Sequence, residues 1–313
     1  MLYSFDIDGT ILNHKEGAPL QDCLDSRAIY AIVQSLIEGD VILINTGRCT
    51  IDILQQICGE IFSFVYLVNA DGENYFSNQE RWRFFEAFNS NFYISNFCGA
   101  CLRQAKPRLK KEILREAYSN NRTYVRFSEP LYEHKISEKT IDKLNILIHN
   151  HAYFENIGKN YSARTANKQQ ERRVIDLALE PATYLFYRQQ SPIKRDNISR
   201  ENQIRKLLKP KSLPLNINCY GDKGAAFVSN KATKATPIAY LKQKYNFNTN
   251  EVAHFGNETN DIIPQNLGHS YIIKNDYFIK QQEVEKHKLD NVTFINDVPS
   301  KLAEIKLDKM LQK

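Results

Sequence analysis

The stretch Leu2-Tyr3-Ser4-Phe5-Asp6-Ile7-Asp8-Gly9-Thr10 is the starting point for interpreting the whole chain. Its first four residues predict a short buried strand, which delivers the carboxylates of Asp6 and Asp8 onto the following turn. Gly9 allows the backbone to curl there, so that both side chains can point the same way. A pair of this kind can hold a divalent cation and still leave one oxygen for chemistry.

Residues 6–10 have two other interpretations. An EF-hand loop also begins with Asp-x-Asp, but it needs glycine at its sixth position and glutamate at its twelfth. Here the glycine is fourth and Gly17 stands at position twelve, which excludes an EF-hand. An acidic turn that caps a helix remains open for this pentapeptide taken alone.

The composition of the 313-residue chain is typical of a soluble globular protein with one large or two ordinary domains. We expect a cytoplasmic protein without a membrane segment, because the sequence has no run of eighteen apolar residues and no charged-then-apolar leader. The six cysteines are scattered and predict reduced thiols. The pair Cys98 and Cys101 lacks the second pair or the histidines that would complete a zinc site. Oligomeric state is not predicted.

Charge is distributed unevenly along the chain. Residues 75–220 carry 26 Lys and Arg against 14 Asp and Glu, a net charge of +12, while the remainder carries 16 against 22, a net charge of −6. The asymmetry suggests that a basic inserted domain binds an anionic partner or substrate and lies over a core domain that holds a cation. A solvated basic surface without a role is an equal alternative. Because the basic residues form no recognition module, nucleic-acid binding is not favoured.

Alternating strand and helix patterns predict a doubly wound, mostly parallel α/β sheet. The predicted strands are residues 2–5, 41–44, 64–68, 252–255, 270–274 and 292–295, and the predicted helices include 23–38, 50–58, 276–288 and 297–311. The carboxyl ends of neighbouring parallel strands meet at one edge of a sheet. Thr46, which follows the second strand, should therefore lie beside Asp6 and Asp8.

Four short motifs should meet at this edge. They are Asp6-Ile7-Asp8-Gly9-Thr10-Ile11, Asn45-Thr46-Gly47-Arg48, Lys234-Ala235-Thr236-Pro237-Ile238-Ala239-Tyr240-Leu241 and Gly256-Asn257-Glu258-Thr259-Asn260-Asp261. In this order they resemble the haloacid dehalogenase superfamily of phosphotransferases. The resemblance implies a Rossmann-like core at 1–73 and 221–313, with 74–220 inserted as an α+β cap, as in members similar to sugar-phosphate and sucrose-phosphate phosphatases. Such a cap closes over the active site and selects the substrate.

The resemblance implies a task for each motif residue. Asp6 would attack phosphorus and form an aspartyl-phosphate, and Asp8 would be the general acid and base. Thr46, Gly47 and Lys234 would hold the phosphoryl oxygens. Taken singly, these residues have structural alternatives, since a threonine in this place can simply cap the next helix.

Mg²⁺ is the implied cofactor, with Asp6, Asp8, Asn257 and Asp261 as its ligands. Asn257 stands where the family usually has aspartate, so magnesium affinity should fall unless Asp261 moves closer to the metal. Lys231 competes with Lys234 for the phosphate role. The apolar spacing that follows residue 234 favours Lys234.

The leading interpretation is a magnesium-dependent phosphomonoester hydrolase acting on a sugar or another small phosphorylated metabolite. A phosphatase for phosphoproteins, such as those carrying phosphotyrosine, is the alternative, and a mutase is not excluded. A non-catalytic binding protein of the same fold is a further alternative, supported only by Asn257. Arg126, Arg164 and Arg188 are candidates for substrate binding in the cap on the basis of their charge.

Overall fold

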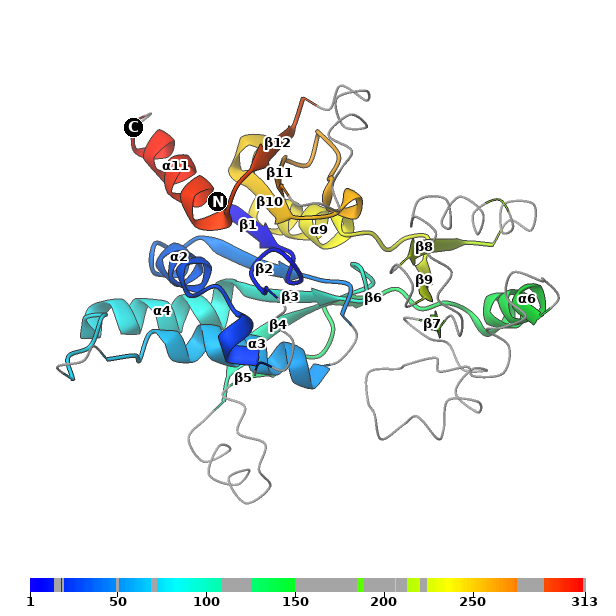
Figure 1. Cartoon of the computed structure of the whole chain (residues 1–313), viewed down its shortest axis with the longest axis horizontal. Helices are drawn as coiled ribbons and strands as arrows, with labels where there is room; N and C mark the ends of the chain where they lie inside the picture. The colour runs from blue at the N-terminus through cyan, green and yellow to red at the C-terminus, as the bar shows by residue number, and fades with distance from the viewer. Residues whose placement is uncertain are drawn as a thin grey trace, which may run out of the picture.

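The computed structural model describes residues 1–13, 18, 20–48, 51–68, 72–108, 125–149, 185–188, 206, 213–219, 224–274 and 290–311. The strands are β1 (Leu2–Phe5), β2 (Val41–Asn45), β3 (Phe92–Asn96), β4 (Cys101–Pro107), β5 (Val125–Phe127), β6 (Tyr132–Glu133), β7 (Leu185–Arg188), β8 (Leu215–Cys219), β9 (Gly224–Ser229), β10 (Val252–Gly256), β11 (His269–Ile273) and β12 (Val292–Ile295). The helices are α1 (Leu20–Cys23), α2 (Ser26–Ile37), α3 (Ile51–Phe64), α4 (Asn78–Asn91), α6 (Glu138–His149), α9 (Ala235–Tyr245) and α11 (Val298–Leu311), with short 3-10 turns at Thr249–Glu251 and Thr259–Asp261. These elements form a large sheet covered by helices and a smaller sheet beside it (Figure 1).

The larger sheet runs in the order β12-β11-β10-β1-β2-β3-β4-β5, and β6 pairs with β4. All pairs from β12 to β3 are parallel, whereas β4 pairs antiparallel with β3, β5 and β6. The chain moves outward from β1 in one direction through β2 and from β10 in the other. The predicted doubly wound, mostly parallel α/β sheet is therefore confirmed. Its switch point lies between β1 and β10, where such sheets place their sites.

Helices cover both faces of the larger sheet, which explains why β1 is buried along its whole length and apolar except at Ser4. Tyr3 and Phe5 pack on the face covered by α2, α3, α4 and α11. Leu2 points to the opposite face, where it packs against Ile238 and Leu241 of α9. Because both faces are buried, any polar side chain within these strands needs a specific partner.

The prediction of a strand over 64–68 is wrong. Helix α3 continues through Phe64, and Val68 forms only an isolated bridge with Asn74. The buried residues Leu54, Ile57, Ile61 and Val65 follow a helical spacing, so the apolar run at 64–68 continues a helical stripe. Strand β3 takes the position beside β2 instead.

The larger sheet also continues past residue 73, the predicted end of the first core segment. Helix α4 begins with a capping box, in which Ser77 and Glu80 satisfy each other's backbone amides. It buries Phe84 and Phe88 in the same core as β1. Strands β3 and β4 then add to the sheet. Part of the aromatic-rich sequence after residue 74 thus belongs to the larger sheet and its covering helices. The division of the chain into a core and a cap remains a prediction.

The smaller sheet consists of β7, β9 and β8, all antiparallel. Ala226 and Val228 of β9 share a buried apolar cluster with Ala100 and Cys101 at the β3–β4 hairpin, which joins the two sheets. The helix predicted over 276–288 lies outside the described residues. Within the part of the chain that the structure describes, no helix is long and apolar enough to cross a membrane.

Candidate active site

Asp6 and Asp8 follow β1 at the edge of the sheet where the parallel strands end. The amide of Asp6 donates to the carbonyl of Phe255 in β10 (2.8 Å), which extends the β1–β10 ladder by one residue. Gly9 has a φ of +74° and its amide donates to the carbonyl of Leu12, so the chain turns sharply after Asp8. Asp6 is buried, with 5% of its surface exposed, whereas the side chain of Asp8 is 41% exposed.

Thr46 follows β2 at the same edge, as predicted. It is buried, and its amide donates to the carbonyl of Ser95 in β3 (2.9 Å). Its hydroxyl accepts from the amide of Arg48 (3.1 Å), which closes a tight turn around Gly47. Asn45, at the end of β2, donates from Nδ2 to the carbonyl of Lys234 (2.7 Å). This last bond fixes the start of α9 against β2.

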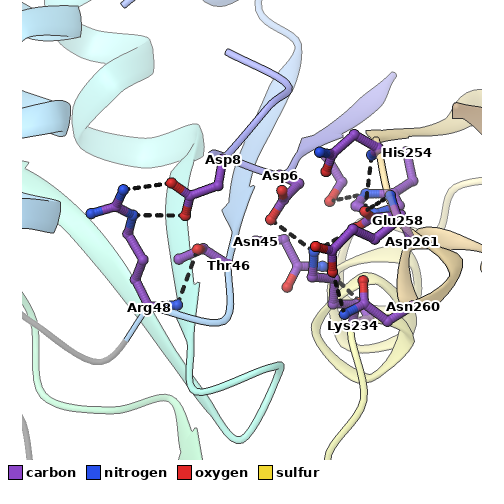
Figure 2. Close-up of polar contacts among 12 residues, drawn as sticks. Asp6, Asp8, Asn45, Thr46, Arg48, Lys234, His254, Glu258, Asn260 and Asp261 are labelled. Carbon is purple, nitrogen blue, oxygen red and sulfur yellow. Dashed lines mark hydrogen bonds and ion pairs between the residues drawn. The ribbon is translucent and has the colours of Figure 1, made fainter. Parts of the chain in front are cut away.

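Lys234 is the lysine that reaches the carboxylates, and Lys231 is exposed. The Lys234 ammonium is buried and lies 2.7 Å from Oδ1 of Asp6 and 2.6 Å from Oδ1 of Asp261. Figure 2 shows this cluster on one side of Asp6, with Asp8, Thr46 and Arg48 on the other. The structure therefore brings together the predicted residues 6, 8, 46, 47, 234 and 261, with Asn257 beside Gly9.

Both oxygens of the Asp261 carboxylate are occupied. Oδ1 accepts from Lys234 and lies 3.1 Å from Nε2 of His254, and Oδ2 accepts from the amides of Asn257 and Glu258 at 3.0 Å each. These contacts hold the turn after β10 and orient the lysine. In this arrangement the carboxylate is held by four contacts within the protein, and a role for Asp261 as a direct metal ligand stays a prediction.

Ser4 and His254 belong to this network, although the sequence analysis did not select them. They are neighbours in the β1–β10 register, both fully buried, and His254 Nδ1 lies 2.9 Å from the Ser4 hydroxyl. A continuous polar chain thus runs from Ser4 through His254, Asp261 and Lys234 to Asp6. The signal in the sequence was one polar residue within each of two otherwise apolar strands.

The hairpin between β3 and β4 was also missed. Its residues Phe97, Cys98 and Gly99 all have left-handed backbone conformations, with φ of 55°, 55° and 87°. Such conformations are costly for residues with a side chain and are often found near functional sites. The amide of Cys98 donates to the carbonyl of Thr46 (3.1 Å), and Gly99 lies directly against the backbone of Thr233. The hairpin therefore ties the Thr46 turn to the segment that carries Lys234.

The buried cluster holds two carboxylates against one ammonium, so one negative charge is not balanced. Burial raises the pKa of Asp6 to about 8; the charge of Asp261 adds to the shift and Lys234 opposes it. Burial alone would lower the pKa of Lys234, but the carboxylates of Asp261 and Asp6 outweigh burial and raise it. Burial would raise the pKa of Asp261, but Lys234 and His254 lower it. Glu258, which borders this cluster, has a pKa raised by burial. A further positive charge beside Asp6 would stabilise its ionised form.

The donor set beside Asp6 fits a small hard cation such as Mg²⁺, which prefers oxygen ligands and keeps several waters. Asp6, Asp8 and Asn257 offer oxygens at this edge, and the side-chain oxygen of Asn260 is buried with no hydrogen-bond partner among the described residues. The described residues contain no group of three His, Cys, Asp or Glu side chains able to hold a metal. The site would therefore combine carboxylates with amide and main-chain oxygens.

Asn257 packs against the turn that carries the carboxylate pair. A Cβ built on Gly9 would lie 2.2 Å from Nδ2 of Asn257, so this side chain can approach only because residue 9 is glycine. Asn257 therefore lies close to the turn that carries Asp8, which is required if both residues bind the same metal. Its amide side chain contributes no charge. The same close approach would be open to the aspartate that the family usually has here.

Of the arginines predicted for the cap, Arg126 lies away from this site. Arg126 lies in β5, an edge strand of the larger sheet, paired with Lys106 of β4. Four strand spacings, about 19 Å, separate β5 from β1. Residues 125–127 pair with the larger sheet, and the substrate-binding role of Arg126 in a cap stays a prediction. Arg188 is the last residue of β7 in the smaller sheet, and Arg164 lies outside the described residues.

Comparison with known proteins identifies the family. Residues 77–276, more than half of the chain, match the haloacid dehalogenase-like hydrolases. The chain therefore belongs to the haloacid dehalogenase-like hydrolase family, and the predicted membership and hydrolase class are confirmed. No curated protein matches the sequence.

Solved structures of this family share the fold over nearly the whole chain. The sucrose-phosphatase of Synechocystis sp. PCC6803, in complex with sucrose and phosphate, has a TM-score of 0.54 at 11% identity and covers 98% of both chains. A haloacid dehalogenase-like hydrolase from Bacteroides thetaiotaomicron has a TM-score of 0.56 at 15% identity, covering 97% of this chain and 98% of its own. A subclass IIB sugar phosphatase has a TM-score of 0.54 at 13% identity, covering 99% and 98%. At these identities the likeness establishes the fold.

Proposed function

We propose that the protein is a magnesium-dependent phosphatase that hydrolyses a phosphomonoester through an aspartyl-phosphate on Asp6. The observation that carries the proposal is the meeting of Asp6, Asp8, Thr46 and Lys234 at the switch point of the sheet. One nucleophile, one candidate proton donor and two groups suited to phosphoryl oxygens lie on the same edge. Phosphoryl transfer needs little more from a protein than positioning and charge neutralisation.

The first step would break the ester bond. An oxygen of Asp6 attacks phosphorus while the bond from phosphorus to the ester oxygen breaks, and Asp8 gives its proton to the departing oxygen. Among the described residues, Asp6 accepts a hydrogen bond through Oδ1, from Lys234, so Oδ2 remains for the attack. The Thr46 hydroxyl, the Gly47 amide and Lys234 would hold the phosphoryl oxygens.

The second step would release phosphate. Asp8 takes a proton from a water molecule, whose oxygen attacks phosphorus, and the bond between phosphorus and Asp6 breaks to restore the carboxylate. Mg²⁺ bound by Asp6, the main chain of Asp8 and Asn257 would neutralise charge on the phosphoryl group. Asp261 would keep Lys234 aligned through both steps, since its own oxygens are held by four contacts.

A sugar phosphate or another small phosphorylated metabolite is the proposed substrate class. The sucrose-phosphatase and the subclass IIB sugar phosphatase named above support this class, because both share the fold over nearly the whole chain. Phosphoproteins stay the alternative substrate class. The cytoplasmic location expected from the sequence also stays a prediction.

The test is hydrolysis of para-nitrophenyl phosphate with and without MgCl₂ by the wild type, Asp6→Asn and Asp308→Asn. Asp308 is exposed on α11 and makes the third variant a matched control for the loss of one carboxylate. We expect magnesium-dependent turnover in the wild type and the control. Asp6→Asn should lose at least about 1,000-fold in turnover, because removal of a nucleophile lowers kcat by several orders of magnitude. Mass spectrometry of acid-quenched wild type should detect a phosphoryl group on Asp6.

A panel of sugar phosphates and phosphotyrosine peptides would then separate the two substrate classes by kcat/KM. A wild type without turnover across divalent metals and pH would favour the non-catalytic binding protein. Equal activity in wild type and Asp6→Asn would remove Asp6 as the nucleophile.

A further inference from the structure

Arg48 holds the carboxylate of Asp8 at both oxygens. Its Nε donates to Oδ2 at 2.8 Å, and its Nη2 donates to Oδ1. The two side chains are 20% and 41% exposed, so the pair lies at the mouth of the site and not in the core. Figure 2 shows the guanidinium on the far side of Asp8 from Asp6. A bidentate pair of this kind is among the stronger polar contacts in proteins.

This pair conflicts with the task proposed for Asp8. To pass a proton to a departing oxygen and later take one from water, the carboxyl group must turn one oxygen toward the substrate. While the fork of Arg48 holds both oxygens, the carboxylate cannot turn toward the substrate. Release of Asp8 therefore requires the arginine to find another partner during the reaction.

A phosphomonoester supplies that partner. It brings negative charge to a site that already holds Asp6, Asp8 and Asp261, and Lys234 already lies between two of these carboxylates. A guanidinium fork matches two phosphoryl oxygens as well as it matches a carboxylate. The amide of Arg48 donates to the hydroxyl of Thr46, so the backbone of the arginine is fixed beside a residue proposed to bind phosphate.

We propose that Arg48 exchanges partners during the catalytic cycle. Without substrate it pairs with Asp8, and when a phosphomonoester binds it moves to the phosphoryl oxygens and releases Asp8. Arg48 is then a substrate-binding residue whose movement makes Asp8 available only when a phosphoryl group is present. The inference rests on the proposed function and adds a residue to the phosphate site.

Equilibrium binding of inorganic phosphate tests the exchange without turnover. Calorimetry with MgCl₂ would compare the wild type, Arg48→Ala, Asp8→Asn and the double variant. If Asp8 competes with phosphate for Arg48, Asp8→Asn should bind phosphate about tenfold more tightly than the wild type, and the double variant should lose that gain. Arg48→Ala should bind about 10- to 100-fold more weakly, as expected for the loss of a hydrogen bond to a charged group.

Steady-state kinetics gives a second measurement. Removing Arg48 weakens substrate binding, so KM for para-nitrophenyl phosphate should rise about 10- to 100-fold. It also leaves Asp8 free of the guanidinium, so kcat should change by about threefold or less. Millimolar guanidinium should partly restore KM in Arg48→Ala. Arg48→Lys, which keeps the charge without the fork, should lie between the wild type and Arg48→Ala. Arg81→Ala is the matched control, because Arg81 is a half-buried arginine bonded to Asn74 and Asn78 at the start of α4, away from the site.

The outcomes separate the two proposals. A wild type that neither hydrolyses para-nitrophenyl phosphate nor binds phosphate overturns both. An active wild type whose phosphate affinity and KM are unchanged in both Arg48→Ala and Arg48→Lys overturns the exchange alone. A loss of kcat at constant KM, without rescue by guanidinium, would also overturn it, because that result indicates a structural anchor for the Thr46 turn.

Discussion

The ammonium group of Lys234 lies 2.7 Å from the carboxylate of Asp6, although 228 residues separate them in the chain. Two features of the fold bring them together. Strands β1 and β10 are parallel neighbours, and the start of α9 is fastened to β2 by Asn45. The same ammonium lies 2.6 Å from Asp261, so a single cation holds the two acids on either side of the switch point.

Lys234→Ala should cost both stability and activity. It leaves the buried carboxylate of Asp261 without its cation and Asp6 without its hydrogen-bond donor, and a loss of roughly 3 kcal/mol in the free energy of unfolding is typical of such a change. Urea denaturation measures this loss, and para-nitrophenyl phosphate hydrolysis should fall at least 100-fold. Lys231→Ala, three residues away and exposed, should change neither quantity. Equal effects of the two substitutions would contradict the assignment of Lys234.

Asp6→Asn should stabilise the metal-free protein at neutral and alkaline pH. In the folded state burial raises the pKa of Asp6 to about 8 from its ordinary value of 3.8. The protonated form is thus the stable one, and its contribution is lost progressively as pH rises from about 4 through 8. In EDTA, the wild-type Tm should fall over this range relative to that of Asp6→Asn, with a difference of about 2 °C or more at pH 8. Parallel Tm curves for the two proteins would contradict the raised pKa.

Gly99→Ala and Gly39→Ala form a matched pair. Both glycines have a φ of +87°, but a Cβ on Gly99 would lie 1.8 Å from the carbonyl oxygen of Thr233, whereas a Cβ on Gly39 meets nothing within 4 Å. Gly39→Ala should cost about 1–2 kcal/mol, from the backbone conformation alone. Gly99→Ala should cost clearly more and should also lower activity, because it displaces the segment that carries Lys234. Urea denaturation and turnover measure the two effects, and equal costs at both positions would argue against the contact with Thr233.

Asn257→Asp should tighten magnesium binding. The new carboxylate would lie against Gly9, beside the acid pair, and would add an anionic oxygen to the donor set. We expect the magnesium concentration for half-maximal activity to fall roughly tenfold, while the Tm in EDTA falls because another negative charge enters the cluster. Asn78→Asp, at the exposed first residue of α4, is the control. An unchanged magnesium requirement would show that residue 257 is not a ligand.

Much of the site was predictable because its signals are local. The motifs at Asp6, Thr46 and Asn257 each follow a short apolar run, and polar residues directly after buried parallel strands converge at one edge of a sheet. The helical spacing of apolar residues after residue 234 similarly favoured Lys234 over Lys231 as the phosphate-binding lysine. None of these inferences required knowledge of which distant segments pack together.

Long-range packing decided the remainder. The apolar run at 64–68 was compatible with either a helix end or a strand. In the structure β3 occupies the position beside β2, and the hairpin that follows β3 is hydrogen-bonded to the Thr46 turn. The sequence suggested Asp261 as a metal ligand, whereas only the structure showed that His254 and Lys234 contact its carboxylate. The sequence by itself determined the order of the elements and the chemical groups at their ends, because these depend on neighbours along the chain. Only the tertiary structure decided which groups contact each other, since the partners of a buried charge are set by packing between strands and helices remote in sequence.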